Sequence, residues 1–430
     1  MPENKMHPAF TVFIAACIYN FFAYGLFMNS MGLFLVPITK ALDFTYGAYS
    51  ISTTTRALCG AVGTVALGFF MPKFKSSRHY FAILSLAFVV IFLLHTTFTQ
   101  LWQFYVAAVI QGLVNGMAIY STCSILMTQW FTSPAKYIGI TGSLAGVGGI
   151  IFSPILGWVF ANYSWKAGYF IFAGVALLVL LPLSLCFLRY NPDEIGAEPY
   201  DSKVSGADES KATLRSLVSD MSSKEAFRQP IMIAVIIYLA ASAMISGIFV
   251  QVPAVLASKG FGSILVGAVT SFYQIGTFLS QFIIGFLIGR IGYRYTGLMY
   301  CAIVAVGSIG VVLVNEPVIP VFAGLLFCLG MGRAFGPTQG PILVRAAFGA
   351  KDYRQIWSKI YPVFIVISAS LATIMGYVYD LTGSFSAVFM FMSGSIVVLA
   401  VAIGVITAFI ARREREAQKP LEQLTVEEAR

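Results

Sequence analysis

The chain has 430 residues, of which 58% are hydrophobic and only 10% are charged. A soluble domain of this length would carry about 25% charged residues. The apolar residues form stretches of about 20 to 28 residues, which as helix are long enough to cross the hydrocarbon core of a bilayer. Because every backbone polar group must be paired inside lipid, repeated stretches of this length predict an all-α membrane protein and exclude a soluble one.

Twelve membrane-spanning helices are expected in chain order. Their predicted ranges are 8–37, 47–71, 79–99, 102–130, 137–161, 166–188, 230–257, 262–288, 295–314, 317–345, 355–381 and 385–411. The first range lacks a short apolar segment followed by a small-residue cleavage site, so it is interpreted as a retained helix and not as a signal peptide.

The net charge of +9 has an asymmetric distribution. Basic residues gather after the even-numbered spans, in the 190–229 segment and in the tail from Arg412, whereas the loops after odd-numbered spans hold only Lys40, Lys166 and Lys259. This asymmetry follows the positive-inside rule and predicts a multi-pass protein of a bacterial inner membrane with both termini in the cytoplasm. Since the basic excess is topological, nucleic acid is excluded as a partner.

One long polar segment, residues 191–229, is rich in Ser, Asp, Glu and Lys and has too few apolar residues to form a core. It divides the chain into an N-terminal six-helix bundle over 1–190 and a C-terminal six-helix bundle over 230–411. The segment itself is expected to be a cytoplasmic linker, and residues 412–430 a cytoplasmic tail.

The two halves resemble each other at an offset of 215 to 217 residues. The matched features are Gly32–Pro37 with Gly247–Pro253, Gly68-Phe69-Phe70 with Gly285-Phe286-Leu287, and Phe131 and Lys136 with Phe348 and Lys351. Parallel six-helix repeats are an established transporter architecture, in which the substrate binds between the halves near the midplane of the bilayer.

This layout resembles the major facilitator superfamily over essentially the whole chain. The resemblance implies two pseudo-symmetric six-helix bundles. The family's cytoplasmic loop signature, glycine followed by Asp-Arg and a basic cluster, is present twice in weakened form. Pro72-Lys73 and Gly289-Arg290 stand where the Asp-Arg pair would be, so the family's usual charge latch is not expected on either copy.

Within that superfamily the chain looks like the oxalate–formate antiporter and monocarboxylate porter branch. The similar stretches are Trp130-Phe131 with Lys136 and the glycines from Gly139 to Gly148, Asn191–Gly196, and Gly330–Pro341 with Phe348-Gly349. The oxalate-type members place basic residues on helices eight and eleven, but the aligned positions here are Gln281 and Val363-Phe364. The resemblance therefore implies transport of a small organic anion, and the neutral residues at these positions favour a monocarboxylate over oxalate.

Two arginines lie inside predicted spans. Arg56 is nine residues into the second span, about 13 Å along the helix. Arg333 is about two-thirds along the tenth. Such charges cost at least about 2.5–3.5 kcal/mol to insert and normally mark a substrate or ion path. Because no aspartate or glutamate lies well inside any span, an anionic substrate is expected to supply the countercharge. The alternatives are that each guanidinium binds helix carbonyls or reaches an interface, or that Arg333 serves a cytoplasmic gate.

Polar side chains at matching depths complete the predicted substrate site. They are Asn20, Tyr24, Asn29, Gln111, Asn115, Tyr120, Tyr273, Gln274, Gln281 and Tyr361. Each could bind a carboxylate in a cavity, or could equally join neighbouring helices, a role worth about 0.6 kcal/mol.

No intramembrane Asp, Glu or His offers an evident proton relay, so exchange or uniport by alternating access is favoured over proton-coupled monocarboxylate symport. A sensor derived from the same fold is a further alternative, although the tail is short. A membrane enzyme and a multidrug exporter are disfavoured, because the spans contain neither a catalytic cluster nor a cavity carboxylate. No cofactor or metal is expected, and the protein is expected to act as a monomer in the lipid bilayer.

Overall fold

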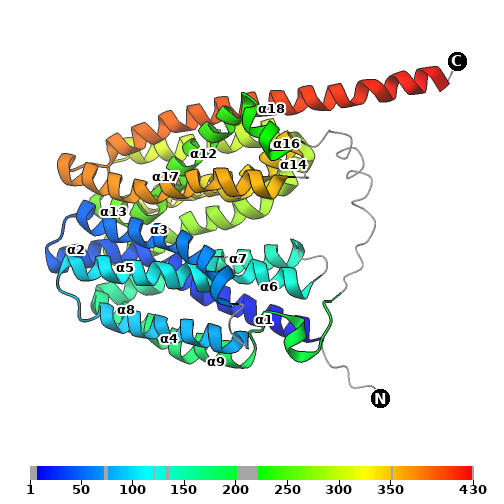
Figure 1. Ribbon diagram of the computed structural model, residues 1–430. Helices are drawn as coiled ribbons and strands as arrows, with labels where there is room; N and C mark the ends of the chain where they lie inside the picture. The colour runs from blue at the N-terminus through cyan, green and yellow to red at the C-terminus, as the bar shows by residue number, and fades with distance from the viewer. Residues whose placement is uncertain are drawn as a thin grey trace.

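The computed structural model describes residues 7–71, 76–120, 122–131, 135–200, 221–349 and 352–428. Long helices lie roughly side by side, and the helices of the first half of the chain pack beneath those of the second half (Figure 1). Both termini lie at the same end of the molecule, here called the termini side, and the opposite end is called the far side. Pro72-Lys73, Lys351 and most of the polar segment fall outside the described residues.

The first bundle contains six spans, each of one or more helical segments. They are α1 to α2 (Pro8–Leu42), α3 (Tyr46–Phe70), α4 (Ser77–His95), α5 to α6 (Leu101–Trp130), α7 (Ala135–Asn162) and α8 to α9 (Trp165–Cys186).

The second bundle follows the short helices η6 (Pro192–Ile195) and α11 (Ser223–Arg228). Its helices are α12 to α13 (Ile231–Ser258), α14 (Ser263–Leu313), α15 to α16 (Ile319–Phe348), α17 (Tyr353–Thr382) and α18 (Ser386–Glu428). The 51-residue α14 is broken at Gly292, whose φ of 80° and ψ of 169° are not helical, so it supplies two spans.

These bounds confirm the twelve-helix fold. Ten segments are long and apolar enough to cross a membrane; the two parts of α14 count as one of them, and α3 adds another span. Two ends differ from the prediction. The first span continues to Leu42, because Pro37 lies in the first turn of α2 (Leu35–Leu42), where proline does not break a helix. The last helix continues beyond 411 through Glu428, in a stretch dominated by good helix formers.

The internal repeat is visible where helices lose regular α geometry. The first span contains a 3-10 turn, η2 (Met31–Phe34), and the seventh contains η7 (Ile248–Gln251). The fourth span contains η4 (Gly116–Tyr120), and the tenth contains η8 (Gly332–Ala334) and η9 (Phe335–Gln339). Two pairs of equivalent spans are thus interrupted at equivalent places, in agreement with the offset seen in the sequence. The π-helical η1 (Phe21–Met28) and η5 (Ala176–Leu180) of the first bundle have no counterpart among the described residues of the second.

Close helix packing inside the first bundle depends on glycine. A Cβ on Gly112 would lie 2.5 Å from the Arg56 carbonyl oxygen, and one on Gly116 would meet the backbone of Gly60. The paired glycines of the fourth span therefore let α5 and η4 lie directly on the α3 backbone, as small residues do at membrane helix interfaces.

The two bundles contact each other closely over the far-side half of the molecule. A Cβ on Gly157 of α7 would lie 2.9 Å from the Gly267 Cα of α14, and one on Gly376 of α17 would lie 2.8 Å from the Gly47 Cα. The hydrogen bonds that join two described residues across the bundles also lie in this half. They join Ser271 to Ile150, Gln274 to Asn29, Thr54 to Ala369 and Thr373, Gln251 to Ser50, and Asp380 to Tyr46 and Gly47.

Asp380 closes the far side with a charge-assisted contact. Its carboxylate accepts hydrogen bonds from the backbone N–H groups of Tyr46 at 3.0 Å and Gly47 at 2.7 Å, the first two residues of α3. Since the first N–H groups of a helix have no partner in the helix and carry the positive end of its dipole, a carboxylate there stabilises the contact between α17 and α3.

In the termini-side half, the described glycines of α7 and α14 no longer contact the opposite bundle. On α7, Gly146 is the last described glycine that closely contacts α14 in the direction of the termini side. A Cβ on Gly146 would lie 3.2 Å from the Phe278 Cβ. Beyond that level, Cβ atoms on Gly142, Gly285 and Gly289 would meet nothing within 4 Å. Gly142, unlike Gly146, therefore makes no close contact with a neighbouring helix.

The glycine contact predicts a stability change. Gly116→Ala places a methyl carbon against the Gly60 carbonyl oxygen and 2.5 Å from the Thr64 backbone nitrogen, so α3 and η4 must separate. We expect a loss of about 1–3 kcal/mol of stability, measured as a lower Tm of the purified protein in detergent. Gly139→Ala is the matched control, because its Cβ would meet nothing within 4 Å; equal Tm values for the two variants would contradict the packing argument.

The Asp380 contact predicts a conformational shift. Asp380→Asn removes the charge and one acceptor, which weakens far-side closure by about 1 kcal/mol and raises the far-side-open population about fivefold. The measurement is the distance between spin labels at Thr99 and Ser384 on opposite far-side loops, in a background whose native cysteines are replaced by serine. Glu316→Gln removes a far-side carboxylate outside this contact and should leave the distance distribution unchanged.

Candidate functional site

Arg56 lies on α3, just beyond the hydrogen bonds that join Thr54 to α17. Only 9% of its surface is exposed, and within the described ranges it forms no hydrogen bond or ion pair. Its charge interacts electrostatically with polar aromatic groups of the first bundle, which are Tyr49, His95, Tyr120 and Tyr169.

Among the described residues, no carboxylate pairs with Arg56. The sequence contains no aspartate or glutamate between Asp43 and Asp193, a range that covers every helix from α3 to α9. The guanidinium therefore lies inside the bundle with aromatic neighbours and without a countercharge.

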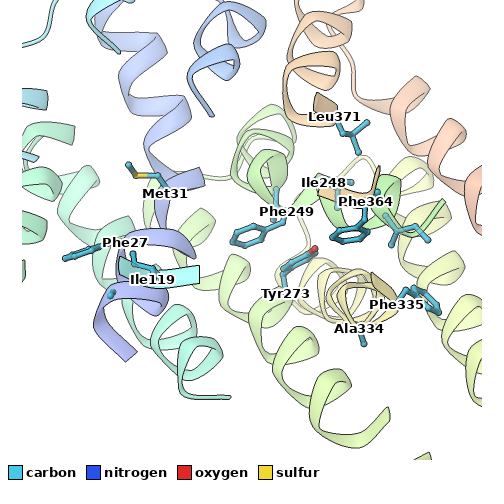
Figure 2. Packing of buried hydrophobic residues seen from close by; sticks show 14 of the residues in the cluster. Phe27, Met31, Ile119, Ile248, Phe249, Tyr273, Ala334, Phe335, Phe364 and Leu371 are labelled. Carbon is cyan, nitrogen blue, oxygen red and sulfur yellow. The ribbon is translucent and has the colours of Figure 1, made fainter. Parts of the chain in front are cut away.

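Arg333 lies on η8, in the interrupted part of the tenth span. Its guanidinium carbon is 4.5 Å from the ring centroid of Phe249, which in turn stacks on Tyr273 at 5.5 Å and 24°. Figure 2 shows the Phe249 and Tyr273 rings side by side between the helices. The Nη1 atom of Arg333 and the hydroxyl of Tyr273 are buried, and neither has a hydrogen-bond partner in the part of the chain that the structure describes.

Three tyrosines lie near the two arginines. Tyr120 interacts with Arg56 and with Tyr24 of the first bundle. Tyr361 of the second bundle interacts with Tyr24 and with Arg333. All three tyrosines are partly exposed.

An aromatic face on α17, which the sequence reasoning missed, continues from this group toward the termini side. Tyr361 stacks on Phe364 at 5.3 Å and on Trp357 at 4.8 Å, and Trp357 stacks on Tyr353 at 6.4 Å. The spacing of three and four residues puts these rings on one helix face, and that spacing was visible in the sequence. Phe249 could not be identified from sequence spacing, because it contacts Arg333 and Tyr273, which lie in other spans.

Some predicted amides join helices. The side-chain nitrogen of Asn20 donates to the Thr141 carbonyl at 2.6 Å, and that of Asn29 donates to the Ala145 carbonyl at 2.9 Å. Gln274 donates to the Asn29 carbonyl at 3.2 Å, which ties the bundles together. These contacts match the alternative in which polar groups join neighbouring helices.

Other predicted amides are buried without partners. Asn115 is 0% exposed, and neither its side-chain nitrogen nor its oxygen has a hydrogen-bond partner in the described ranges. The side-chain oxygens of Gln111 and Gln274 are also unpaired there. A buried polar atom without a partner costs about 1–3 kcal/mol, so these amides have hydrogen-bonding capacity that the described residues do not use.

Gln281 and Lys359 lie apart from this group. Gln281 is exposed beyond the level at which the bundles diverge. The Lys359 ammonium lies 5.4 Å from the Phe227 ring centroid and donates to the Ser223 hydroxyl at 3.5 Å, at the termini-side end of α17.

Together these residues form a candidate anion site near the middle of the bundle. Arg56 and Arg333 supply one cation from each bundle, and tyrosines and amides supply hydrogen-bonding groups between them. A guanidinium can bind a carboxylate through two parallel hydrogen bonds. Such a site can bind and release a solute, and the described residues at it provide no nucleophile paired with a base.

Solved structures of transporters share this fold. The nucleoside transporter NupG is 16% identical with a TM-score of 0.70, and the alignment covers 94% of this chain and 99% of that one. A bacterial homolog of the human lysosomal transporter Spinster, in an inward-facing and unoccupied conformation, is 14% identical with a TM-score of 0.60, over 97% of this chain and 98% of that one. At these identities the likeness shows the fold alone.

Sequence comparison places the chain in a family. The class H tetracycline resistance protein of Pasteurella multocida is 35% identical over 102 residues, which are 23% of this chain and about a quarter (24%) of that protein's length. A model described as Major Facilitator Superfamily matches residues 16–354 and, in an overlapping match, residues 236–429. The chain therefore belongs to the major facilitator superfamily and is a multi-pass membrane transporter.

Proposed function

We propose that this transporter moves small organic anions, monocarboxylates in particular, across the bacterial inner membrane. The observation that carries the proposal is the pair of interior guanidiniums, Arg56 and Arg333, that lack an acidic partner in the described ranges. An unpaired cation in a low-dielectric interior is strongly destabilised, and a bound anion removes that penalty. Oxalate-type transporters have basic residues at the positions aligned with Gln281 and Val363-Phe364, which are neutral here. A substrate with one negative charge therefore suits this site better than oxalate, which has two.

The mechanism we propose is alternating access. The sealed far side and the diverging termini side leave the site open toward the termini. With the termini placed in the cytoplasm by the positive-inside rule, this is the inward-open state. Rocking of the 1–190 bundle against the 230–411 bundle, joined by the 191–229 linker, then exposes the site to the other side.

Exchange or uniport fits this interior better than dedicated proton coupling. His95, the histidine near the site, donates from Nδ1 a 2.7 Å hydrogen bond to the Ile91 carbonyl of its own helix, and stacks on Tyr169 at 4.6 Å. These contacts give it a structural role. A monocarboxylate that carries its own proton, as in symport, is the alternative within the same substrate class.

A neutral planar solute is a second candidate. The unpaired amide of Asn115 and the aromatic face of α17 could bind the hydrogen-bonding edge and the ring of a nucleoside-like molecule. The shared fold with the nucleoside transporter NupG makes this class worth testing. Nucleoside uptake that survives neutralisation of Arg56 would favour this candidate.

The organic-anion proposal predicts the effect of neutralising Arg56. Arg56→Gln should reduce monocarboxylate exchange in proteoliposomes about ten- to a hundredfold, because a hydrogen bond to a charged group contributes about 1.5–3 kcal/mol. Arg56→Lys should be partly active, since it keeps the charge and loses the planar fork.

The control is Arg294→Gln, which removes an exposed arginine on the termini side and should leave exchange unchanged. Membrane insertion and Tm of each variant show whether it folds. Normal exchange by a folded Arg56→Gln protein would reject the role of Arg56.

A further inference from the structure

A basic pocket lies at the termini side, away from the candidate anion site. It has a volume of about 480 Å³ and lies between α11 and the first turns of α17. Its lining residues are Ser223, Lys224, Phe227, Arg228 and Lys359.

The described acidic residues beside this pocket form no ion pair with its three cations. Asp352 accepts a 2.8 Å hydrogen bond from the Ser223 backbone N–H, and Glu225 accepts one of 2.8 Å from the Ser222 N–H, so both carboxylates cap helix α11. Lys224, Arg228 and Lys359 form no ion pair with any described residue. Three cations around one pocket favour a ligand with a concentrated negative charge, such as a phosphate.

The surroundings of the pocket place it at the membrane surface. Phe227 is 40% exposed beside the three cations. Helix α12 begins directly after α11, and its Ile233 and Ile237 are 64% and 43% exposed, as expected for side chains facing lipid. The pocket thus lies where the apolar surface of the bundle ends, at the depth of lipid head groups.

We propose that this pocket binds the phosphate head group of an anionic phospholipid. Lys224 and Arg228 are four residues apart on α11 and approach the phosphate from one side, while Lys359 approaches it from α17. Basic pockets next to membrane helices on the cytoplasmic side recognise anionic head groups in this way. The exposed isoleucines of α12 offer an apolar surface to the acyl chains, which a free anion would not use.

Binding there would link the interbundle segment to a moving helix. Helix α11 ends the segment that joins the bundles, and it already contacts α17 through Asp352 and Lys359. A head group that binds both α11 and α17 would hold the C-terminal end of the 191–229 segment against the second bundle.

The test is a lipid titration of the full-length protein. Phosphatidylglycerol added to protein in phosphatidylcholine nanodiscs should raise the Tm. The double variant Lys224→Gln/Arg228→Gln and the single variant Lys359→Gln should each shift the titration midpoint, about fivefold per charge removed, since each Lys or Arg near an anionic surface contributes about 1 kcal/mol. Lys359→Arg should restore the wild-type midpoint.

The matched control is Arg290→Gln. Arg290 is also a termini-side cation beside an exposed phenylalanine, with its guanidinium carbon 4.3 Å from the Phe286 ring centroid, but it lies outside the pocket. It should keep the wild-type midpoint.

An equal shift in this control would show that the midpoint depends on general surface charge and not on the pocket, and would overturn the proposal. So would an unchanged midpoint in the pocket variants, or a Tm increase reproduced by inorganic phosphate at the same concentration, which would indicate a free-anion site. The Tm of each variant in phosphatidylcholine alone verifies folding.

Discussion

A positive charge in the interior of a membrane protein is costly unless a negative or polar group compensates it, and the described residues near Arg56 include no carboxylate. No acidic residue occurs between Asp43 and Asp193, so the first bundle contains a buried guanidinium surrounded by aromatic hydroxyls. Arg333 in the second bundle rests on the Phe249 ring with one nitrogen unpaired. This missing countercharge is the constraint on which the proposed substrate class and the proposed location of the site both rest.

The packing of the bundles positions these charges and determines from which side they can be reached. Gly112 and Gly116 bring the fourth span onto the backbone of α3 and so fix the position of Arg56. On the far side, glycine contacts and the Asp380 carboxylate at the start of α3 seal the interface between the bundles. The expected aspartates of the family's loop signature are absent from the termini side. The charge-assisted contact of Asp380 on the far side has no described counterpart of this kind there. It therefore favours the conformation in which the candidate site opens toward the termini.

The sequence predicted the fold well because span length, charge asymmetry and the internal repeat depend only on local composition. The site was harder to predict. Depth along a helix located Arg56 and Arg333, but depth does not give the direction in which a side chain points. Asn20 and Asn29 bind carbonyls of α7, and Gln281 is exposed, because the orientation of each helix is set by its neighbours. The aromatic face of α17 could have been recognised from its spacing, whereas the stack of Arg333, Phe249 and Tyr273 joins three spans and has no signature in the sequence.

The most direct measurement is ligand-induced thermal stabilisation of the purified protein with a panel of monocarboxylates, dicarboxylates and neutral nucleosides. A ligand that binds the folded state raises its apparent stability. Our account predicts that monocarboxylates raise the Tm of the wild-type protein and have no effect on a folded Arg56→Gln/Arg333→Gln variant. Stabilisation by nucleosides alone, or a monocarboxylate effect of the same size in the double variant, would contradict it.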